Sequence, residues 1–368
     1  MKNFYKILTL VGTRPEIIKL SSTIKKIDKF FDQKLVHTGQ NYDYELSEIF
    51  FKDLQIRKPD NFLNCAGTNA NQTIANIFKK LDIFISKFKP DGVLILGDTN
   101  SGLGAIVSKK RGIPVFHLEA GNRSFDYRVP EELNRRIIDH VSDINFAYTD
   151  IAKNNLISEG IYPDRIIKIG SPMKEVLFDQ KNKIKNSQII KSLKLKKKNF
   201  FLISFHREEN VDNFENIKNF LVFLNWLSKK FNKKIVISTH FRTQKVLSKI
   251  KKIHIRNVAY LKPFSFSNYI NLQKNAKLTF SDSGTLTEEA SLLNFKAIML
   301  RESHERPEGM EEGSVIMCGL NLKKIENAIN ILNKSKKNII VKDYQVPNFS
   351  EKVVKNIISY LDYKINKK

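Results

Sequence analysis

The sequence has 368 residues, 41% of them hydrophobic and 27% charged, and its 63 basic and 38 acidic side chains give a formal charge of +25. At the usual size of about 100–200 residues per domain, this length predicts two domains. The apolar fraction excludes a disordered chain, and the 15 glycines and 10 prolines are too few for a fibrous one. The lysines are scattered, without the motif or aromatic interleaving of a nucleic-acid-binding surface, so we expect no nucleic acid as a partner.

The cysteines and the apolar segments indicate a cytoplasmic protein. Cys65 and Cys318 lie far apart and form neither a disulfide framework nor a zinc motif. The apolar run at residues 7–11 has no cleavage site and is soon followed by Arg14, so it is a poor signal peptide. No uncharged apolar stretch reaches about 18 residues, and we therefore predict no membrane-spanning helix.

Short apolar segments rich in Ile, Val, Leu and Phe alternate with longer segments of helical periodicity. Strands are predicted at residues 7–11, 34–37, 92–96, 114–118 and 144–148, and then at 200–205, 234–238, 258–261, 278–280 and 297–300. Helices are predicted at 71–87, 131–141, 214–230, 322–333 and 350–365. Buried strands that alternate with helices are typical of parallel sheets covered on both faces. The fold class is therefore α/β, with two Rossmann-like doubly wound domains.

The strand pattern pauses at residues 179–198, where Lys, Asn, Gln and Ser dominate. We place an N-terminal domain at residues 1–175 and a C-terminal domain at 176–349. Periodicity alone does not assign the last helix, residues 350–368, to either domain.

Polar and charged residues follow nearly every predicted strand. In an open parallel sheet, ligands bind outside the carboxyl ends of the strands. The polar segments lie at residues 12–16, 37–43, 97–101 and 119–123 in the first half and at 206–210, 239–242, 281–285 and 301–306 in the second. Their convergence predicts an active site for a polar ligand in the cleft between the two domains.

Two of these segments have features suited to an anion. Ser283 and Gly284 precede a predicted helix, whose free N–H groups and positive dipole end favour a phosphate, although ordinary N-capping explains a serine there equally well. Glu289, one turn later, either accepts bonds from ribose hydroxyls or is a solvated helix charge. Arg14 lies in a turn that lacks the spaced glycines of a dinucleotide-binding fingerprint, so the turn is better suited to placing one guanidinium near an anion.

Asp98, Glu119 and Glu131 are carboxylates at or just beyond strand ends of the first domain. Clustered carboxylates raise one another's pKa, which allows one to act as a base while another stays protonated as an acid. Structural explanations also exist: turn capping for Asp98, a satisfied buried carboxylate for Glu119, and dipole pairing after a proline for Glu131. His206 either contacts a phosphate, transfers a proton or packs at its strand end. No tight metal-ligand spacing occurs, and we expect no catalytic metal.

Together these segments resemble the non-hydrolysing UDP-N-acetylglucosamine 2-epimerase family. The matching segments occur in the family's order from about residue 7 to 313: residues 12–16 with Lys19, 37–40, 97–100, 119–121, 130–135, 206–207, 283–284 and 288–289. The resemblance implies two domains of the glycosyltransferase-B type with the UDP-sugar in their cleft, and a C-terminal helix that packs back on the first domain. It also implies a homodimer and no cofactor.

The resemblance also implies roles for individual residues. Asp98, Glu119, Glu131 and His206 correspond to catalytic residues. The residues expected at the UDP-sugar are Arg14, Lys19, Arg207, His240, Tyr269, Ser283, Gly284, Glu289 and Arg301. Among them, Arg14, Ser283 and Gly284 are expected to hold UDP, Glu289 its ribose and Tyr269 its uracil, while Lys19 supports the active site.

Within the family, residues 119–126, 170–173, 206–212 and 304–312 are most similar to the epimerases of N-acetyl-L-fucosamine synthesis. Asn122, Ser171 and Glu208 differ from the residues usual in UDP-N-acetylglucosamine enzymes. This branch implies inversion of carbon 2 in UDP-2-acetamido-2,6-dideoxy-L-talose, by elimination and re-addition of UDP, for capsule or O-antigen. The alternatives are a UDP-N-acetylglucosamine 2-epimerase forming UDP-N-acetylmannosamine, a UDP-N-acetyl-L-rhamnosamine 2-epimerase, a hydrolysing epimerase and a glycosyltransferase of the same fold.

Overall fold

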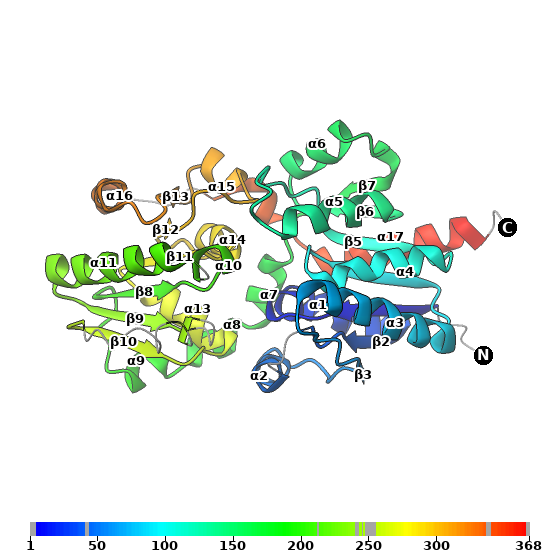
Figure 1. Ribbon diagram of the computed structural model, residues 1–368, viewed down its shortest axis with the longest axis horizontal. Coiled ribbons are helices and arrows are strands. Elements are labelled where there is room, and N and C mark those ends of the chain that lie inside the picture. The colour runs from blue at the N-terminus through cyan, green and yellow to red at the C-terminus, as the bar shows by residue number, and fades with distance from the viewer. Residues whose placement is uncertain are drawn as a thin grey trace. The chain divides into compact units, whose positions relative to one another are not determined.

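The computed structural model describes residues 5–40, 44–211, 213–239, 243–244, 246, 255–335 and 340–365. It divides into two compact units (Figure 1), which we call unit 1, Met1–Asp179 with Asp343–Lys368, and unit 2, Gln180–Lys342. Each unit contains one parallel sheet with helices between successive strands. The predicted fold class, two Rossmann-like doubly wound domains, is confirmed.

Unit 1 has a seven-stranded parallel sheet in the order β3-β2-β1-β4-β5-β6-β7. The strands are β1 (Lys6–Val11), β2 (Asp32–His37), β3 (Asn61–Phe62), β4 (Gly92–Leu96), β5 (Val115–Ala120), β6 (Ile144–Ala147) and β7 (Ile166–Lys168). The strand order reverses between β1 and β4, which both lie at the centre of the sheet. In doubly wound sheets such a switch point opens the crevice in which ligands bind.

Helices cover both faces of the unit 1 sheet, because α1 packs against α2, α7 and α17, whereas α4 packs against α3 and α5. The helices are α1 (Arg14–Phe30), α2 (Tyr44–Asp53), α3 (Ala70–Phe88), η1 (Asn100–Leu103), α4 (Gly104–Lys110), α5 (Glu131–Val141), α6 (Asp150–Ser158), η2 (Pro163–Arg165), α7 (Met173–Asp179), η3 (Lys342–Gln345) and α17 (Phe349–Ile365). Between the layers lie aliphatic side chains such as Leu8 and Val93 of the sheet and Leu81 of α3, all fully buried. The continuous apolar strands are therefore buried on both faces.

The last helix, α17, is part of unit 1. The Tyr360 hydroxyl donates to Asp143 Oδ1 at 3.1 Å, and the Tyr360 ring meets Phe116 of β5 edge-on at 5.6 Å. At its other end, Ser350 donates from its backbone N–H and its hydroxyl to Glu175 of α7. These contacts hold α17 on unit 1, whereas sequence periodicity did not assign this helix to either domain.

Unit 2 has a six-stranded parallel sheet in the order β10-β9-β8-β11-β12-β13, and its switch point lies between β8 and β11. The strands are β8 (Phe200–Ser204), β9 (Lys234–Ser238), β10 (Val258–Leu261), β11 (Leu278–Ser281), β12 (Ala297–Met299) and β13 (Ile316–Met317). The helices are α8 (Lys181–Asn186), α9 (Ile189–Ser192), α10 (Glu208–Val211), α11 (Phe214–Phe231), α13 (Phe266–Asn275), α14 (Thr285–Leu293), α15 (Glu308–Glu311) and α16 (Leu322–Lys334). Among the residues given above, no helix is long and apolar enough to cross a membrane.

Candidate active site

Asp98 lies beyond the end of β4, at the switch point of unit 1. Its Oδ2 accepts from Arg135 Nε at 3.1 Å and Nη2 at 2.7 Å, and Asn134 Nδ2 donates to its backbone carbonyl at 2.9 Å. Both partners come from α5, and the Asp98 side chain is still 26% exposed. The carboxylate is thus held firmly by a guanidinium while part of it stays accessible to a ligand.

Glu119 is the fifth residue of β5 and has a φ of +70°. The left-handed region is costly for a residue with a side chain and occurs preferentially at functional sites. A register irregularity in the pairing of β5 with β6 accompanies this conformation. The Glu119 carboxylate pairs with Lys19 of α1, and both side chains are largely buried. Lys19 therefore fixes a carboxylate, which agrees with the supporting role expected for it.

Glu131 is the first residue of α5 and is partly exposed. Residues three and four positions apart on a helix share a face. Glu131 therefore lies on the face of α5 that presents Asn134 and Arg135 to Asp98. The contacts of Asn134 and Arg135 thus bring the first turn of α5, which carries Glu131, to the end of β4, which is followed by Asp98.

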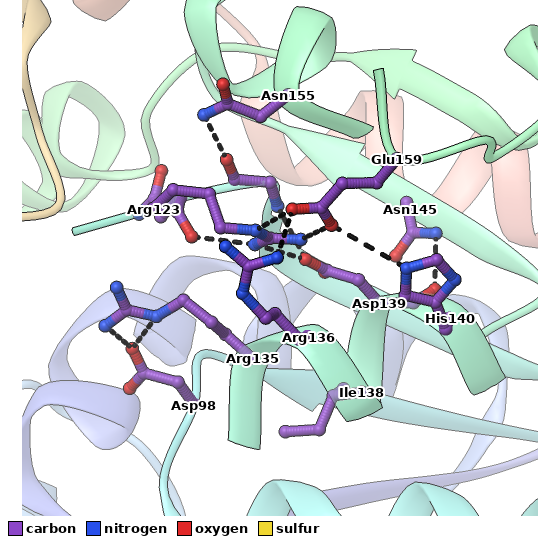
Figure 2. A network of polar contacts seen from close by, with 12 residues as sticks. Asp98, Arg123, Arg135, Arg136, Ile138, Asp139, His140, Asn145, Asn155 and Glu159 are labelled. Carbon is purple, nitrogen blue, oxygen red and sulfur yellow. Dashed lines mark hydrogen bonds and ion pairs between the residues drawn. The ribbon is translucent and has the colours of Figure 1, made fainter. Parts of the chain in front are cut away.

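A network of buried ion pairs holds the segment between β5 and α5 (Figure 2). Arg123 is fully buried, and it donates to both carboxylate oxygens of Glu159, from Nε at 2.8 Å and from Nη2 at 2.5 Å. Its Nη1 lies 2.7 Å from Asp139 Oδ2. Burial alone would raise the pKa of Asp139, but the adjoining His117 and Arg123 hold it below its usual range.

The same network continues to Asp98. Arg136 joins Glu159, at 2.8 Å, to Glu132, at 3.3 Å. Glu132 in turn accepts from Arg135 Nη1 at 2.8 Å, and Arg135 is the residue that binds Asp98. An unbroken series of alternating charges therefore connects α6 with the candidate catalytic carboxylate.

Glu16 is a buried carboxylate of the switch point that the sequence analysis did not single out. Its Oε2 accepts the backbone N–H groups of Gly12 and Thr13, the latter at 2.9 Å, and its Oε1 accepts the Thr99 hydroxyl at 2.5 Å. It thereby ties the turn after β1, which carries Arg14, to the turn after β4, which carries Asp98. Burial raises the pKa of Glu16 to about 7. The hydrogen bonds lower this pKa, and the nearby negative charge of Asp98 raises it further.

In unit 2, Asp282 has the corresponding place between the turns after β8 and β11. The carboxylate is buried, and its Oδ2 accepts the backbone N–H groups of His206 and Arg207, both at 2.9 Å. His206 and Arg207 are each partly exposed. Each switch point thus has a buried carboxylate that binds two backbone N–H groups of a turn carrying predicted site residues.

Three of the residues predicted in unit 2 meet at Glu305, which the sequence analysis did not assign. Arg301 Nη1 lies 2.9 Å from Glu305 Oε2, and Arg207 Nη2 lies 3.3 Å from Oε1. A β-carbon at Gly284 would lie only 2.3 Å from Glu305 Oε1. A larger residue at 284 would therefore displace the Glu305 carboxylate, which pairs with both guanidinium groups.

The remaining predicted residues of unit 2 lie on α13 and around the start of α14. Ser283 precedes α14 at its N-terminal end, where its hydroxyl lies 3.0 Å from that of Thr285. Glu289 is buried and accepts from Gln273 Nε2 at 2.6 Å, so it is not a solvated helix charge. Burial and the adjoining Glu289 raise the pKa of Tyr269. His240 lies outside the described residues.

The predicted residues therefore form two groups. Unit 1 holds Arg14, Lys19, Asp98, Glu119 and Glu131, and unit 2 holds His206, Arg207, Tyr269, Ser283, Gly284, Glu289 and Arg301. Within the described part of the chain, no three His, Cys, Asp or Glu side chains are placed to hold a metal ion. The carboxylates missed by the sequence analysis, Glu16, Asp282 and Glu305, are each buried against the turns that carry the predicted residues.

Comparisons with known proteins show the family to which the chain belongs. The sequence model of the family described as UDP-N-acetylglucosamine 2-epimerase matches residues 25–360. A Methanococcus maripaludis protein described as UDP-N-acetylglucosamine 2-epimerase is 39% identical over 345 residues, which cover 90% of this chain and 92% of that protein. A structure described as UDP-N-acetylglucosamine 2-epimerase from Rickettsia bellii is 44% identical, with a TM-score of 0.90 and 98% of both chains covered. The Methanocaldococcus jannaschii UDP-GlcNAc 2-epimerase, in complex with UDP-GlcNAc and UDP, is 35% identical with a TM-score of 0.90, covering 96% of this chain and 99% of that one.

Proposed function

Since the chain belongs to the UDP-N-acetylglucosamine 2-epimerase family, whose members are isomerases, we propose that it interconverts UDP-N-acetylglucosamine and UDP-N-acetylmannosamine. The observation that carries this proposal is the similarity over nearly the whole chain to proteins described by that activity, one of them in complex with UDP-GlcNAc. This substrate differs from the 6-deoxy-L-hexose that we expected from four sequence segments. The similar proteins named above favour UDP-N-acetylglucosamine instead, which was among the alternatives.

The chemistry of the substrate explains why carboxylates and cations are both needed. The proton on carbon 2 of a 2-acetamido sugar is weakly acidic, so its direct removal is costly. In the proposed reaction a base removes this proton as UDP leaves carbon 1, which gives a glycal and bound UDP. Reprotonation of carbon 2 on the other face and return of UDP to carbon 1 then complete the inversion. General acid–base groups and donors that stabilise the departing diphosphate are both required.

The two groups of residues suit the two parts of this reaction. We propose that Asp98, Glu119 and Glu131 handle the proton on carbon 2, with Asp98 accessible and oriented by Arg135. Lys19 supports this group by holding Glu119.

The residues of unit 2 would bind the UDP moiety of the same substrate molecule. Ser283 and Gly284, at the start of α14, would bind the diphosphate together with Arg207, Arg301, His206 and His240, and Arg14 of unit 1 would add a further cation. Glu289 would accept from the ribose hydroxyls, and Tyr269 would lie near the uracil. A helix N-terminus supplies unpaired N–H groups to a phosphate.

One observation keeps the L-hexose substrate as a second candidate. Asn122 is buried, and its Nδ2 has no hydrogen-bond partner among the residues that the structure describes. A buried amide without a partner is costly, and a substrate oxygen would satisfy it. In contrast, Ser171 gives no support, because its hydroxyl accepts from the Met173 N–H at 3.1 Å at the start of α7.

The substrate is tested by incubating the purified enzyme separately with UDP-N-acetylglucosamine, UDP-2-acetamido-2,6-dideoxy-L-talose and UDP-N-acetyl-L-rhamnosamine. NMR of the proton on carbon 2 reports the configuration of each product. We expect the highest kcat/KM with UDP-N-acetylglucosamine. A higher value with either L-sugar would overturn the substrate proposal and leave the 2-epimerase class intact. Sedimentation equilibrium of the same sample tests whether the enzyme is a homodimer. The homodimer, the cytoplasmic location and a role in capsule or O-antigen synthesis stay predictions.

A further inference from the structure

The two oxygens of the Asp282 carboxylate have different neighbours. Oδ2 accepts the backbone N–H groups of His206 and Arg207 at 2.9 Å each, and Asn210 Nδ2 donates to it at 3.1 Å. Oδ1 is buried and lies 3.2 Å from His206 Nδ1. One oxygen therefore holds the turn after β8, and the other faces the imidazole ring.

The neighbours of Asp282 favour its ionised form. Burial by itself would raise its pKa, but the adjoining His206 ring, the Arg207 N–H and the Asn210 amide lower it to about 2. An ionised carboxylate only accepts hydrogen bonds, and Oδ1 lies 3.2 Å from Nδ1 without another hydrogen-bond partner among the described residues, so it favours the proton on that ring nitrogen. Ser204 Oγ also lies 3.2 Å from Nδ1, and a hydroxyl both donates and accepts. Asp282 is thus the neighbour of Nδ1 that selects one protonation state.

We propose that Asp282 is a positioning residue for His206, which keeps the imidazole protonated at Nδ1 and leaves the lone pair of the neutral ring on Nε2. The inference rests on the proposed function, in which His206 acts at the departing diphosphate. The negative charge of Asp282 also stabilises the imidazolium that forms when Nε2 takes up a proton from solvent as the diphosphate binds. In that form Nε2 donates to an oxygen of the diphosphate as the bond to carbon 1 breaks, and it keeps this role when UDP returns. The His206 side chain is 30% exposed and Asp282 is fully buried, so the carboxylate affects the substrate through the His206 ring and not by direct contact.

The Asp282→Asn variant separates this role from support of the turn. An asparagine oxygen in place of Oδ2 still accepts from the two backbone N–H groups, whereas the new NH₂ group faces Nδ1. Because that NH₂ group only donates, Nδ1 must become the acceptor, and the proton moves to Nε2. An aspartate-to-asparagine change of this kind lowers kcat about 10⁴-fold in a serine-protease triad, where it leaves the geometry intact and imposes the wrong tautomer.

The experiment uses the full-length enzyme with ¹⁵N-labelled histidine. The chain has seven histidines, and the His206→Gln variant identifies the resonances of His206. We expect the Nδ1–H tautomer in the wild-type protein. In Asp282→Asn we expect the Nε2–H tautomer and a loss in kcat of about 100-fold or more, with the Kd for UDP changed less than about threefold. Trp226, the single tryptophan, lies on α11 of unit 2, so its fluorescence reports whether that unit is folded.

Ser204→Ala is the matched control, because it removes the other neighbour of Nδ1. We expect the Nδ1–H tautomer in this variant and a kcat within about threefold of the wild type. The proposal is overturned if wild-type His206 is the Nε2–H tautomer, if Asp282→Asn retains Nδ1–H, or if Ser204→Ala is the variant that loses it. If Asp282→Asn does not fold, the wild-type and Ser204→Ala spectra decide the question. A wild-type enzyme without epimerase activity would contradict the proposed function alone, because the tautomer is measured independently of turnover.

Discussion

At the residue scale, the accessible and the buried carboxylates of the switch points have different tasks. Asp98 is 26% exposed and is bound by one guanidinium, so it is both oriented and able to reach a ligand. Glu16 and Asp282 are buried and bind backbone N–H groups. Exposure therefore distinguishes Asp98, one of the three carboxylates proposed for catalysis, from the two that hold the turns.

Asp98→Asn is the direct test of that assignment. The amide keeps the size of the side chain but does not take a proton, so we expect kcat to fall by about 10²–10⁴-fold. The Kd for UDP, measured by calorimetry, should change less than about threefold. The control is Asp82→Asn, which alters an exposed carboxylate paired with Arg111 at 2.7 Å and should leave kcat unchanged. A near-normal rate in Asp98→Asn would remove Asp98 from the catalytic group.

Glu16 makes the stability of unit 1 depend on pH. Burial raises its pKa from an ordinary 4.5 to about 7, so the folded chain binds this proton more tightly than the unfolded chain does. The contribution of Glu16 to the free energy of unfolding is therefore full below pH 4.5 and is lost as the pH rises to about 7.

Glu16→Gln removes this dependence, because glutamine does not ionise. Relative to the wild type, the free energy of unfolding of the variant should rise by up to about 3 kcal/mol between pH 4.5 and 7 and stay level above pH 7. Urea unfolding followed by circular dichroism at several pH values measures this difference. Asp82→Asn should show no such rise. If the free energies of unfolding of Glu16→Gln and the wild type differ by the same amount at every pH, the raised pKa of Glu16 is contradicted.

At the scale of elements, the segment between β5 and α5 is held by buried charges. Arg123 binds Glu159 of the α6 end and Asp139 of α5, and all three side chains are at least largely buried. Breaking a buried ion pair by removing one partner is strongly destabilising, because it leaves an uncompensated charge.

Arg123→Met removes the guanidinium that joins Asp139 to Glu159, and of these two carboxylates only Glu159 keeps another arginine partner, Arg136. We expect the free energy of unfolding to fall by about 3–5 kcal/mol. The matched control is Arg128→Met, because Arg128 pairs with Asp126 at 2.8 Å while its side chain is 77% exposed. The loss there should stay below about 1 kcal/mol. Urea unfolding measures both losses. Equal losses of unfolding free energy in the two variants would show that burial does not determine how much the Arg123 ion pairs stabilise the protein.

Most strands were predictable from the sequence, since all ten predicted strands occur within two residues of their predicted bounds, whereas the 17-residue helix α1 was not among the predicted helices. The edge strands β3, β7 and β13 were missed, because two or three residues do not form a readable apolar run. Strand-end position made Asp98, Glu119 and Glu131 candidates, and their roles stay predictions. It did not point to the contacts of Glu305 with Arg301 or of Asp282 with His206, because those are set by the packing of separate turns.

At the scale of the whole molecule, the charge of +25 does not describe the site. Arginines of the proposed site form ion pairs with carboxylates, Arg135 with Asp98 and Arg301 with Glu305. The two units, each with a switch point and a buried carboxylate, hold the residues that we propose for proton handling and for UDP binding. We propose that both groups act on one UDP-sugar, through loss and return of UDP.

Turnover of UDP-N-acetylglucosamine in deuterated water tests this claim most directly. The removed proton exchanges with solvent, so we predict that UDP-N-acetylmannosamine forms with deuterium at carbon 2, as seen by the loss of that proton resonance. Substrate recovered at equilibrium should carry the same label. Inverted product that retains its original proton on carbon 2 would contradict the mechanism.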